Sequence, residues 1–369
     1  MFSIVDQTVN EALRKGTRPA DIEAMILMLQ RYPVEAIELS LQHWPESLGA
    51  VLERNALLLR CKVRPSATAI AEAGQRGFKR ITISWLHQTG TETMAELESA
   101  LAAARFFAWE VCLSVENASN FSADDLKRYG TIIARYNVDR LIYHDQNGIL
   151  EPFRTYQDLH ALQQAIPCAL EFHAHNNLGL ATANSLAALR AGIKYVGASV
   201  GGVGVPGHAA MEELFMAVTQ LWKQGKTRTW HSLASDCARI LSRMGIEVPS
   251  DKAVIGTGVF NHESGIHVDG IGKNPSLYEA YQPEAVGLAR NTIIGKHSGT
   301  AALKQKFLQW NIALNQTEAV RLLEQVRALA IAQKGAVSDQ QLRTLYTGNR
   351  AQQPGTGCVG IEHKKGVLR

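Results

Sequence analysis

Several features that mark common protein classes are scarce or missing in this 369-residue chain. Its five cysteines are scattered singly along the sequence, a pattern that excludes a disulfide framework and a CxxC zinc or redox site. No uncharged stretch of roughly 18 residues occurs, and the N-terminus lacks a basic segment followed by a long apolar one. We therefore expect no membrane span and no secretory signal, and we expect a reducing, cytoplasmic compartment.

An excess of one charge is also missing. The chain has 38 basic and 34 acidic residues, which are interspersed and give a net charge of +4. Without a basic face or tail, we expect no nucleic-acid partner. Hydrophobic residues make up 46% and charged residues 20% of the composition, which excludes disorder for most of the chain and allows a large core.

What is present is an alternation of short apolar runs with longer amphipathic ones over the first 225 residues. Eight short runs qualify as strands, and helical patterns separate them. Eight such units predict a (β/α)8 TIM barrel, and a doubly wound open sheet is the alternative. The expected strands are Phe2–Val5, Ala36–Leu39, Leu57–Cys61, Arg80–Ser84, Glu110–Ser114, Arg140–Tyr143, Ala169–His173 and Lys194–Ala198.

The pattern changes after residue 225, where helical segments follow one another without strands between them. We therefore divide the chain into a catalytic barrel at 1–225 and a mainly helical region at 226–348. Residues 349–369 are polar, rich in glycine and without periodicity, so we expect a poorly ordered tail. The helices expected after the barrel are His231–Met244, Thr300–Trp310 and Thr317–Lys334.

Two histidines and a glutamate alternate at the end of the seventh expected strand. Because alternate residues of a strand face the same way, Glu171, His173 and His175 should all point toward the barrel axis at its C-terminal mouth. Two imidazoles and a carboxylate can bind a divalent metal ion. The alternative is that these histidines only make hydrogen bonds at the mouth.

Two further loops end at the same mouth. The loop after the first strand carries Asp6 and Glu11, either of which could add a carboxylate to a metal site or simply cap a helix. The glycine-rich segment 201–207 after the eighth strand leads to His208 and then to a helix. Glycines before a helix N-terminus can approach an anion, although a flexible turn explains them as well.

Dense polar motifs also stand beyond the barrel. The segment 261–270 reads NHESGIHVDG and the segment 295–299 reads GKHSG. Histidine, glutamate, serine and glycine at this density contribute little to a core, whereas they supply acid and base groups on an adaptable backbone. Together they suggest a lid over an active site.

With these motifs in their order, the chain resembles the metal-dependent Claisen-condensing acyltransferases. That family comprises homocitrate synthase, 2-isopropylmalate synthase and citramalate synthase, and the chain is most similar to the homocitrate synthases that serve nitrogenase cofactor assembly in nitrogen fixation. The resemblance runs from Ile4 to about Tyr346. Its most specific motifs lie at Glu171–Asn184, Asn261–Gly270 and Gly295–Gly299.

The resemblance implies a transferase that uses one divalent metal ion (Mg, Mn, Zn or Fe) and acetyl-CoA as co-substrate. The enolate of acetyl-CoA would attack the ketone of a 2-oxo acid, with conversion of 2-oxoglutarate to homocitrate the foremost expectation. It also implies a homodimer in which the helical region serves the neighbouring barrel. By position, the metal ligands would be Glu11, His173, His175 and His208; the substrate-binding residues Glu116, Asp145, Gln146 and Glu171; and the catalytic residues Asn10, His262, His267 and Tyr278.

The chain departs from the family pattern in its first loop. Asn10 stands where the family has an arginine that stabilises enolate charge, and Glu11 stands where it has a metal-binding aspartate. Loss of a cation near developing negative charge slows a reaction, unless Arg60 or Lys62 at the end of the third strand takes its place. Two alternatives therefore stay open: a catalytically impaired paralogue retained as a binding or regulatory partner, and a related barrel lyase or aldolase.

Overall fold

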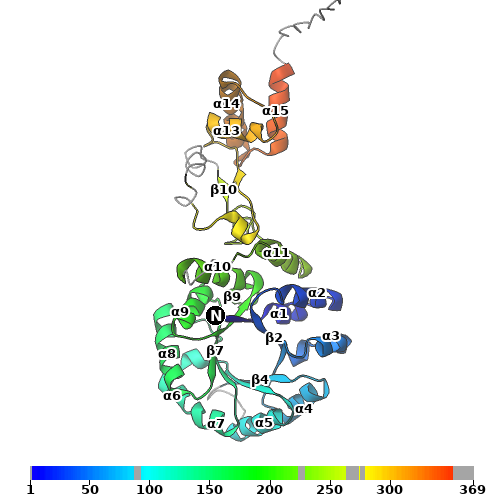
Figure 1. Cartoon of the computed structure of the whole chain (residues 1–369), viewed down its shortest axis with the longest axis vertical. Coiled ribbons are helices and arrows are strands. Elements are labelled where there is room, and N and C mark those ends of the chain that lie inside the picture. The colour runs from blue at the N-terminus through cyan, green and yellow to red at the C-terminus, as the bar shows by residue number, and fades with distance from the viewer. Residues whose placement is uncertain (1, 87–92, 223–228, 263–273, 275–278, 352–369) are drawn as a thin grey trace, which may run out of the picture. The chain divides into compact units, whose positions relative to one another are not determined.

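The computed structural model describes residues 2–86, 93–222, 229–262, 274 and 279–351 (Figure 1). The chain forms two compact units. The first comprises Met1–Val259 with Ala285–Leu288, and the second comprises Phe260–Glu284 with Ala289–Arg369. Within the described residues, no helix combines the length and the apolar character that crossing a membrane would need.

The first unit contains a closed barrel of parallel strands in sequential order. β1 pairs with both β2 and β8, which closes the ring, and a short β9 also pairs in parallel with β8. The predicted TIM barrel is therefore confirmed, and the open sheet is excluded because it would have two free edges. The strands are β1 (Ser3–Asp6), β2 (Val34–Ser40), β3 (Leu59–Val63), β4 (Arg80–Trp85), β5 (Glu110–Val115), β6 (Arg140–Asp145), β7 (Ala169–Ala174), β8 (Tyr195–Ser199) and β9 (Ala209–Ala210).

Helices follow the strands and form the outer layer of the barrel (Figure 1). Between β5 and β6 the chain forms two helices, which meet at Arg128. The short helices α1 and α3 had no sequence prediction, because six or seven residues are too few for a helical period. The helices of this unit are α1 (Thr8–Arg14), α2 (Pro19–Leu29), α3 (Gly49–Arg54), α4 (Ala67–Gln75), α5 (Met94–Phe107), α6 (Ala123–Lys127), α7 (Tyr129–Arg135), α8 (Pro152–Ala165), α9 (Ala181–Arg190), α10 (Met211–Trp222) and α11 (Leu233–Arg243).

The interior of the barrel is charged, whereas barrels of this type usually fill it with branched aliphatic side chains. Arg60 on β3 is fully buried and donates to Glu171 at 2.8 and 2.6 Å and to Glu38 at 2.9 Å. Below this group, Arg140 contacts Glu110 at 2.9 Å and Glu171 at 3.3 Å. Each buried charge has partners of opposite sign, which offsets the cost of removing it from water.

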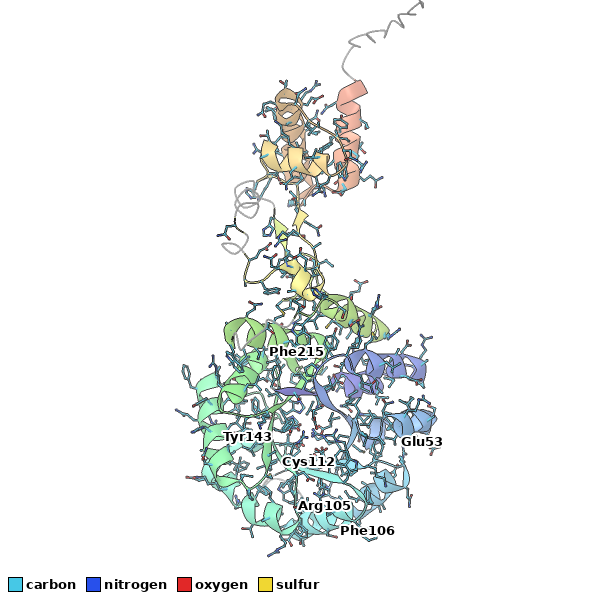
Figure 2. The ribbon with its side chains drawn as sticks, in the orientation of Figure 1. Glu53, Arg105, Phe106, Cys112, Tyr143 and Phe215 are labelled. Carbon is cyan, nitrogen blue, oxygen red and sulfur yellow. The ribbon has the colours of Figure 1, made fainter. Side chains whose placement is uncertain are left out.

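The alternation of side chains along a strand separates this charged interior from the apolar shell. On β6, the hydroxyl of Tyr143 lies 3.2 Å from Asp158 on α8, so that ring packs outward against the helices. Figure 2 shows Tyr143 in the wall of the barrel and Cys112 close to its axis. The next residue after Tyr143 on β6, His144, therefore faces the interior.

The second unit is mainly helical in its described part, and its helices pack on a core of its own. Phe307, Leu322 and Val326 are fully or nearly fully buried in that core. α15 reaches Ala351, so the first residues of the expected tail are helical; residues 352–369 lie outside the described part. The elements are β10 (Asn261–His262), β11 (Asn291–Thr292), α13 (Thr300–Leu308), α14 (Gln316–Gln333) and α15 (Asp339–Ala351).

Candidate active site

Four histidines meet at the C-terminal mouth of the barrel. One ring nitrogen from each of His144, His173 and His175 lies within 4.8 Å of the others. His208 joins them, because its Nδ1 lies 3.0 Å from His173 Nε2. The rings of His144 and His173 stack in parallel with centroids 4.3 Å apart. We call these four residues the imidazole cluster.

Glycines make room for two of these rings. Gly197 on β8 pairs with His173 on β7, and a Cβ at Gly197 would come within 2.8 Å of that imidazole. A Cβ at Gly204 would lie 2.8 Å from His208 Cδ2, and Gly204 has a φ of +144°, which other residues rarely adopt. The glycine-rich segment therefore brings His208 onto the cluster.

The chemistry of the cluster fits a metal ion. Burial, and after it the charge of the neighbouring imidazoles, lowers the pKa of His175 to about 2 and holds the pKa of His173 well below its usual value. Neutral imidazoles are the form that binds metals. Nε2 of His144 and Nδ1 of His175 are buried and have no hydrogen-bond partner, an unfavourable state that a bound ion would relieve.

Glu11 supplies a carboxylate at the edge of the cluster. It belongs to α1, directly after β1, and its Oε1 lies 3.9 Å from His208 Nε2. Its other oxygen accepts a hydrogen bond from Arg14 at 2.6 Å. Burial alone would raise the pKa of Glu11, but His208 and Arg14 together bring it below its usual value. Glu11 is thus an anion that can reach an ion held by the histidines.

A second carboxylate borders the cluster on the side of β5. Glu116 Oε2 lies 2.7 Å from His144 Nδ1 and 2.9 Å from Lys62 Nζ. Burial would raise the pKa of Glu116, but Lys62 and His144 lower it far below its usual value. For Lys62, burial would lower the pKa, but Glu116 and Glu38 raise it. The mouth therefore holds a cation and an anion in contact.

A polar hollow of about 650 Å³ opens beside this pair. It lies where the carboxyl ends of β2 to β5 meet, which is the usual position of active sites in such barrels. Lys62 and Glu116 form its inner wall and Arg64 and Arg76 stand farther along it. The hollow is large enough for a small acid. Three cations line it together with two carboxylates, Glu116 and Glu72, which contact Lys62 and Arg76.

Four residues that were predicted to bind substrate or to act in catalysis do not point into the imidazole cluster. Glu171 points into the barrel, but it is fully buried one layer below the cluster and bound to Arg60. Asp145 accepts from the backbone N–H groups of residues 149 and 150, and so it shapes the loop after β6. Gln146 is exposed. Asn10 accepts at 2.9 Å from the N–H of Ser40.

The predicted residues beyond the barrel belong to the second unit. His262 on β10 has its Nε2 3.4 Å from Glu279 Oε1, and Arg290 holds the same carboxylate at 2.7 Å. His267 and Tyr278 lie outside the described residues, and their expected roles stay predictions.

Comparisons with known proteins bear on both units. Residues 10–235 match the family model described as HMGL-like, and residues 254–334 match the one described as homocitrate synthase post-HMGL domain-like. The first match covers more than half of the chain. The chain belongs to the HMGL-like family.

Relatives with curated names agree with this membership. The HMGL-like chain is 40% identical to 2-isopropylmalate synthase 2 of Caldanaerobacter subterraneus over 68% of its own length and 66% of that protein. It is 33% identical to homocitrate synthase 1 of a Nostoc species over 65% and 64% of the two chains. These alignments span slightly less than two thirds of the relatives. The crystal structure of HMG-CoA lyase from Bacillus subtilis, at 18% identity, superposes with a TM-score of 0.56 over 67% of this chain and 95% of that one, which shows the shared fold.

His144 was not among the site residues predicted from the sequence of this HMGL-like chain. The sixth strand was expected to end at Tyr143, whereas β6 continues to Asp145 and carries His144 at an inward position. The available signal was the alternation of Arg140, Ile142 and His144, which puts a histidine in phase with a buried arginine.

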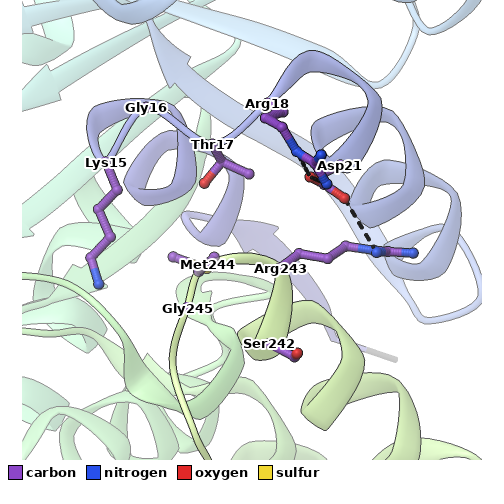
Figure 3. Close-up of a pocket in the computed structure, with 9 residues that line it drawn as sticks. All are labelled: Lys15, Gly16, Thr17, Arg18, Asp21, Ser242, Arg243, Met244 and Gly245. Carbon is purple, nitrogen blue, oxygen red and sulfur yellow. Dashed lines mark hydrogen bonds and ion pairs between the residues drawn. The ribbon is translucent and has the colours of Figure 1, made fainter.

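A second hollow in the HMGL-like barrel unit has no residue in common with the imidazole cluster. It measures about 500 Å³ and lies among α1, α2 and α11 (Figure 3). Lys15 and two arginines line it. Arg18 and Arg243 both contact Asp21, at 2.8 and 3.3 Å. The carboxylate offsets much of their charge.

A buried carboxyl under the glycine-rich segment makes stability depend on pH. Glu212 of α10 is fully buried and accepts at 2.9 Å from the N–H of Gly201, and Lys252 lies 3.6 Å away. Burial raises the pKa of Glu212 from 4.5 to about 7, although Lys252 opposes the shift. The folded state therefore holds this proton more tightly than the unfolded chain does, and stability falls as pH rises from about 4.5 through 7.

We expect Glu212→Gln to stabilise the protein at pH 8 by about 2–3 kcal/mol and to change little at pH 4.5, since a pKa unit corresponds to about 1.4 kcal/mol. Urea unfolding of both proteins across this range measures the difference. Glu46→Gln, at an exposed position, is the matched control and should show no pH-dependent gain. An equal effect of Glu212→Gln at both pH values would contradict the assignment.

Proposed function

We propose that this protein is an acyltransferase that condenses acetyl-CoA with a 2-oxo acid, foremost 2-oxoglutarate to give homocitrate. One observation carries the proposal: the imidazole cluster and Glu11 meet at the mouth of an HMGL-like barrel, beside a hollow lined by Lys62, Arg64 and Arg76. Relatives named as 2-isopropylmalate and homocitrate synthases support it. Arg64 and Arg76 of the hollow suit a second carboxylate of the substrate.

His173, His175, His208 and Glu11 would hold a divalent ion at the mouth. When bound, such an ion supplies Lewis-acid polarisation and a template for the ketone and carboxylate of the 2-oxo acid. The structure offers the donor set in the required protonation state, since the pKa values of the imidazoles and of Glu11 are all lowered.

Residues of the chain can stabilise the negative charge that develops during the reaction. In the reaction, a methyl proton leaves acetyl-CoA, a carbon–carbon bond forms to the ketone carbon, and water then cleaves the thioester to release CoA. Lys62 stands at the inner wall of the hollow and can stabilise negative charge that develops on the enolate and on the former ketone oxygen. Glu116 orients Lys62 through their contact at 2.9 Å.

The test of the proposal is a thiol-release assay with acetyl-CoA and a panel of 2-oxoglutarate, pyruvate and 2-oxoisovalerate. We expect CoA release that requires one of these acids, with 2-oxoglutarate the fastest. The double variant His173→Ala, His175→Ala should release no CoA and should contain about one metal ion less per chain in elemental analysis. Release that is the same in wild type and the double variant would refute the site.

A specific observation keeps the binding-partner alternative in view. Asn10 replaces the family arginine, and its amide is used to hold the backbone of β2 at Ser40. If the wild type binds metal but releases no CoA with any acid of the panel, the protein is a binding or regulatory partner instead of an enzyme.

We also propose that the protein forms a homodimer, because the resemblance assigns His262 and the motif around it to the site of a neighbouring barrel. Sedimentation velocity at micromolar concentration should give a mass of two chains. Mixing two inactive variants, the double histidine variant and His262→Ala, should restore part of the activity. A monomer with full activity would contradict this proposal.

A further inference from the structure

We propose that His144 is a ligand of the ion at the mouth, and that the resulting imidazole-rich site selects a late first-row divalent ion such as Zn²⁺ over Mg²⁺ and Mn²⁺. The inference rests on the proposed function in one respect, since both require an ion beside His173 and His175. It adds a ligand and a choice of metal.

The surroundings of His144 are those of a metal-ligating histidine. Such residues direct one ring nitrogen at the ion and turn the other toward a carboxylate, which fixes the orientation of the ring. His144 Nδ1 lies 2.7 Å from Glu116 Oε2, an ion-pair distance without the angle of a hydrogen bond, and Lys62 donates to the same oxygen at 2.9 Å. Glu116 thus stands where a metal site needs its supporting carboxylate.

The second nitrogen of His144 is left for the ion. Nε2 is buried without a hydrogen-bond partner in a residue that is only 4% exposed. The ring stacks in parallel on His173, and its centroid lies 5.0 Å from that of His175. A histidine that served only to fill space here would bury a polar nitrogen at a cost, whereas coordination satisfies it.

The donor set then decides the metal. Imidazole ligands suit zinc, iron, nickel and copper, whereas magnesium and manganese prefer carboxylate, carbonyl and water oxygens. His144 raises the number of imidazoles at the site from three to four against one carboxylate, Glu11. Such a set favours an ion of the zinc type over the oxygen-seeking ions.

Titration calorimetry of the metal-free protein with Zn²⁺, Mn²⁺ and Mg²⁺, without substrates, tests the inference. We expect the wild type to bind Zn²⁺ at least about 100-fold more tightly than Mn²⁺ or Mg²⁺. His144→Ala should lose at least about 100-fold in Zn²⁺ affinity, and Glu116→Gln about 10–100-fold, the range for supporting carboxylates. His160→Ala, an exposed histidine on α8, is the matched control and should bind like the wild type.

X-ray absorption of the Zn²⁺-bound wild type gives a readout that does not depend on any variant folding. It should count four imidazoles, one more than His173, His175 and His208 supply, and the Co²⁺-bound protein should show a visible spectrum that His144→Ala alters. Three or fewer imidazoles, unchanged Zn²⁺ affinity in His144→Ala, or binding of Mg²⁺ or Mn²⁺ as tight as Zn²⁺ would overturn the inference while leaving the proposed function intact. A wild type that binds none of the three ions would overturn both.

Discussion

Arg60→Met will lower the free energy of unfolding by about 3–5 kcal/mol at pH 7, the usual cost of removing one partner from a buried ion pair. Arg60 is fully buried on β3 and binds both oxygens of Glu171 and one oxygen of Glu38. Methionine fills a similar volume, so the loss reports on charge and not on a cavity. Glu38 and Glu171 would keep their burial and lose their main cation.

The pH dependence of the lost stability in Arg60→Met shows whether the loss comes from the missing charge or from altered packing. In the wild type, burial would raise the pKa of Glu38, but Arg60 and Lys62 bring it below its usual value. Without Arg60, burial dominates and the folded-state pKa of Glu38 rises, so the variant loses stability as pH rises above about 4.5. The gap between the two proteins should therefore be smaller at pH 4.5 than at pH 7.

Denaturant unfolding at both pH values measures the gap. Arg54→Met removes a surface pair with Glu23, of which the arginine is 57% exposed, and should cost no more than about 1 kcal/mol. Adding Glu171→Gln to Arg60→Met should recover part of the loss, because one uncompensated charge is gone. A loss in Arg60→Met that is equal at both pH values, or is no larger than in Arg54→Met, would contradict the role of the charged interior.

The barrel was predictable because its pattern is local and repeated. All eight expected strands exist, and most run one or two residues farther toward the C-terminus than the apolar runs indicate. On β3 and β6, the polar residues Lys62 and His144 belong to the strand and lie one residue before its end. In these two strands the apolar run therefore ends before the strand does. His144 lies just beyond the apolar run, so it was not predicted as a site residue.

The site was predictable only in part, because contacts between distant strands carry no sequence signal. His173 and His175 could be placed by alternation on one strand, and His208 by its position after the last strand. The sequence could not predict the ion pair between Arg60 and Glu171, because 111 residues separate them. The same limit applied to the choice between Arg60 and Lys62 as the cation of the site.

We propose Lys62 as that cation, because Arg60 is fully buried below the imidazole cluster, whereas the side chain of Lys62 is 22% exposed at the hollow. Lys62→Met should therefore lower kcat about 10²–10³-fold, as expected when a preorganised group for developing negative charge is lost. KM for the 2-oxo acid and the metal content should change little. Steady-state kinetics and elemental analysis measure these quantities, and Lys79→Met, at an exposed position on the barrel unit, is the control.

A second variant distinguishes the charge of Lys62 from its contact with Glu116. Both variants are assayed with the metal ion in excess, so that weaker metal binding in Glu116→Gln does not limit the rate. If Lys62 acts through its charge, Lys62→Met combined with Glu116→Gln then stays slow, because the developing oxyanion still lacks a cation. If Lys62 only neutralises Glu116, removing both charges restores kcat to within about tenfold of the wild type, a recovery of at least about 1.4 kcal/mol in the barrier. That recovery, or a fast Lys62→Met, would show that another group supplies the cation that the resemblance expects at position 10. Lys62→Arg should keep more activity than Lys62→Met, because it retains the positive charge that the reaction requires.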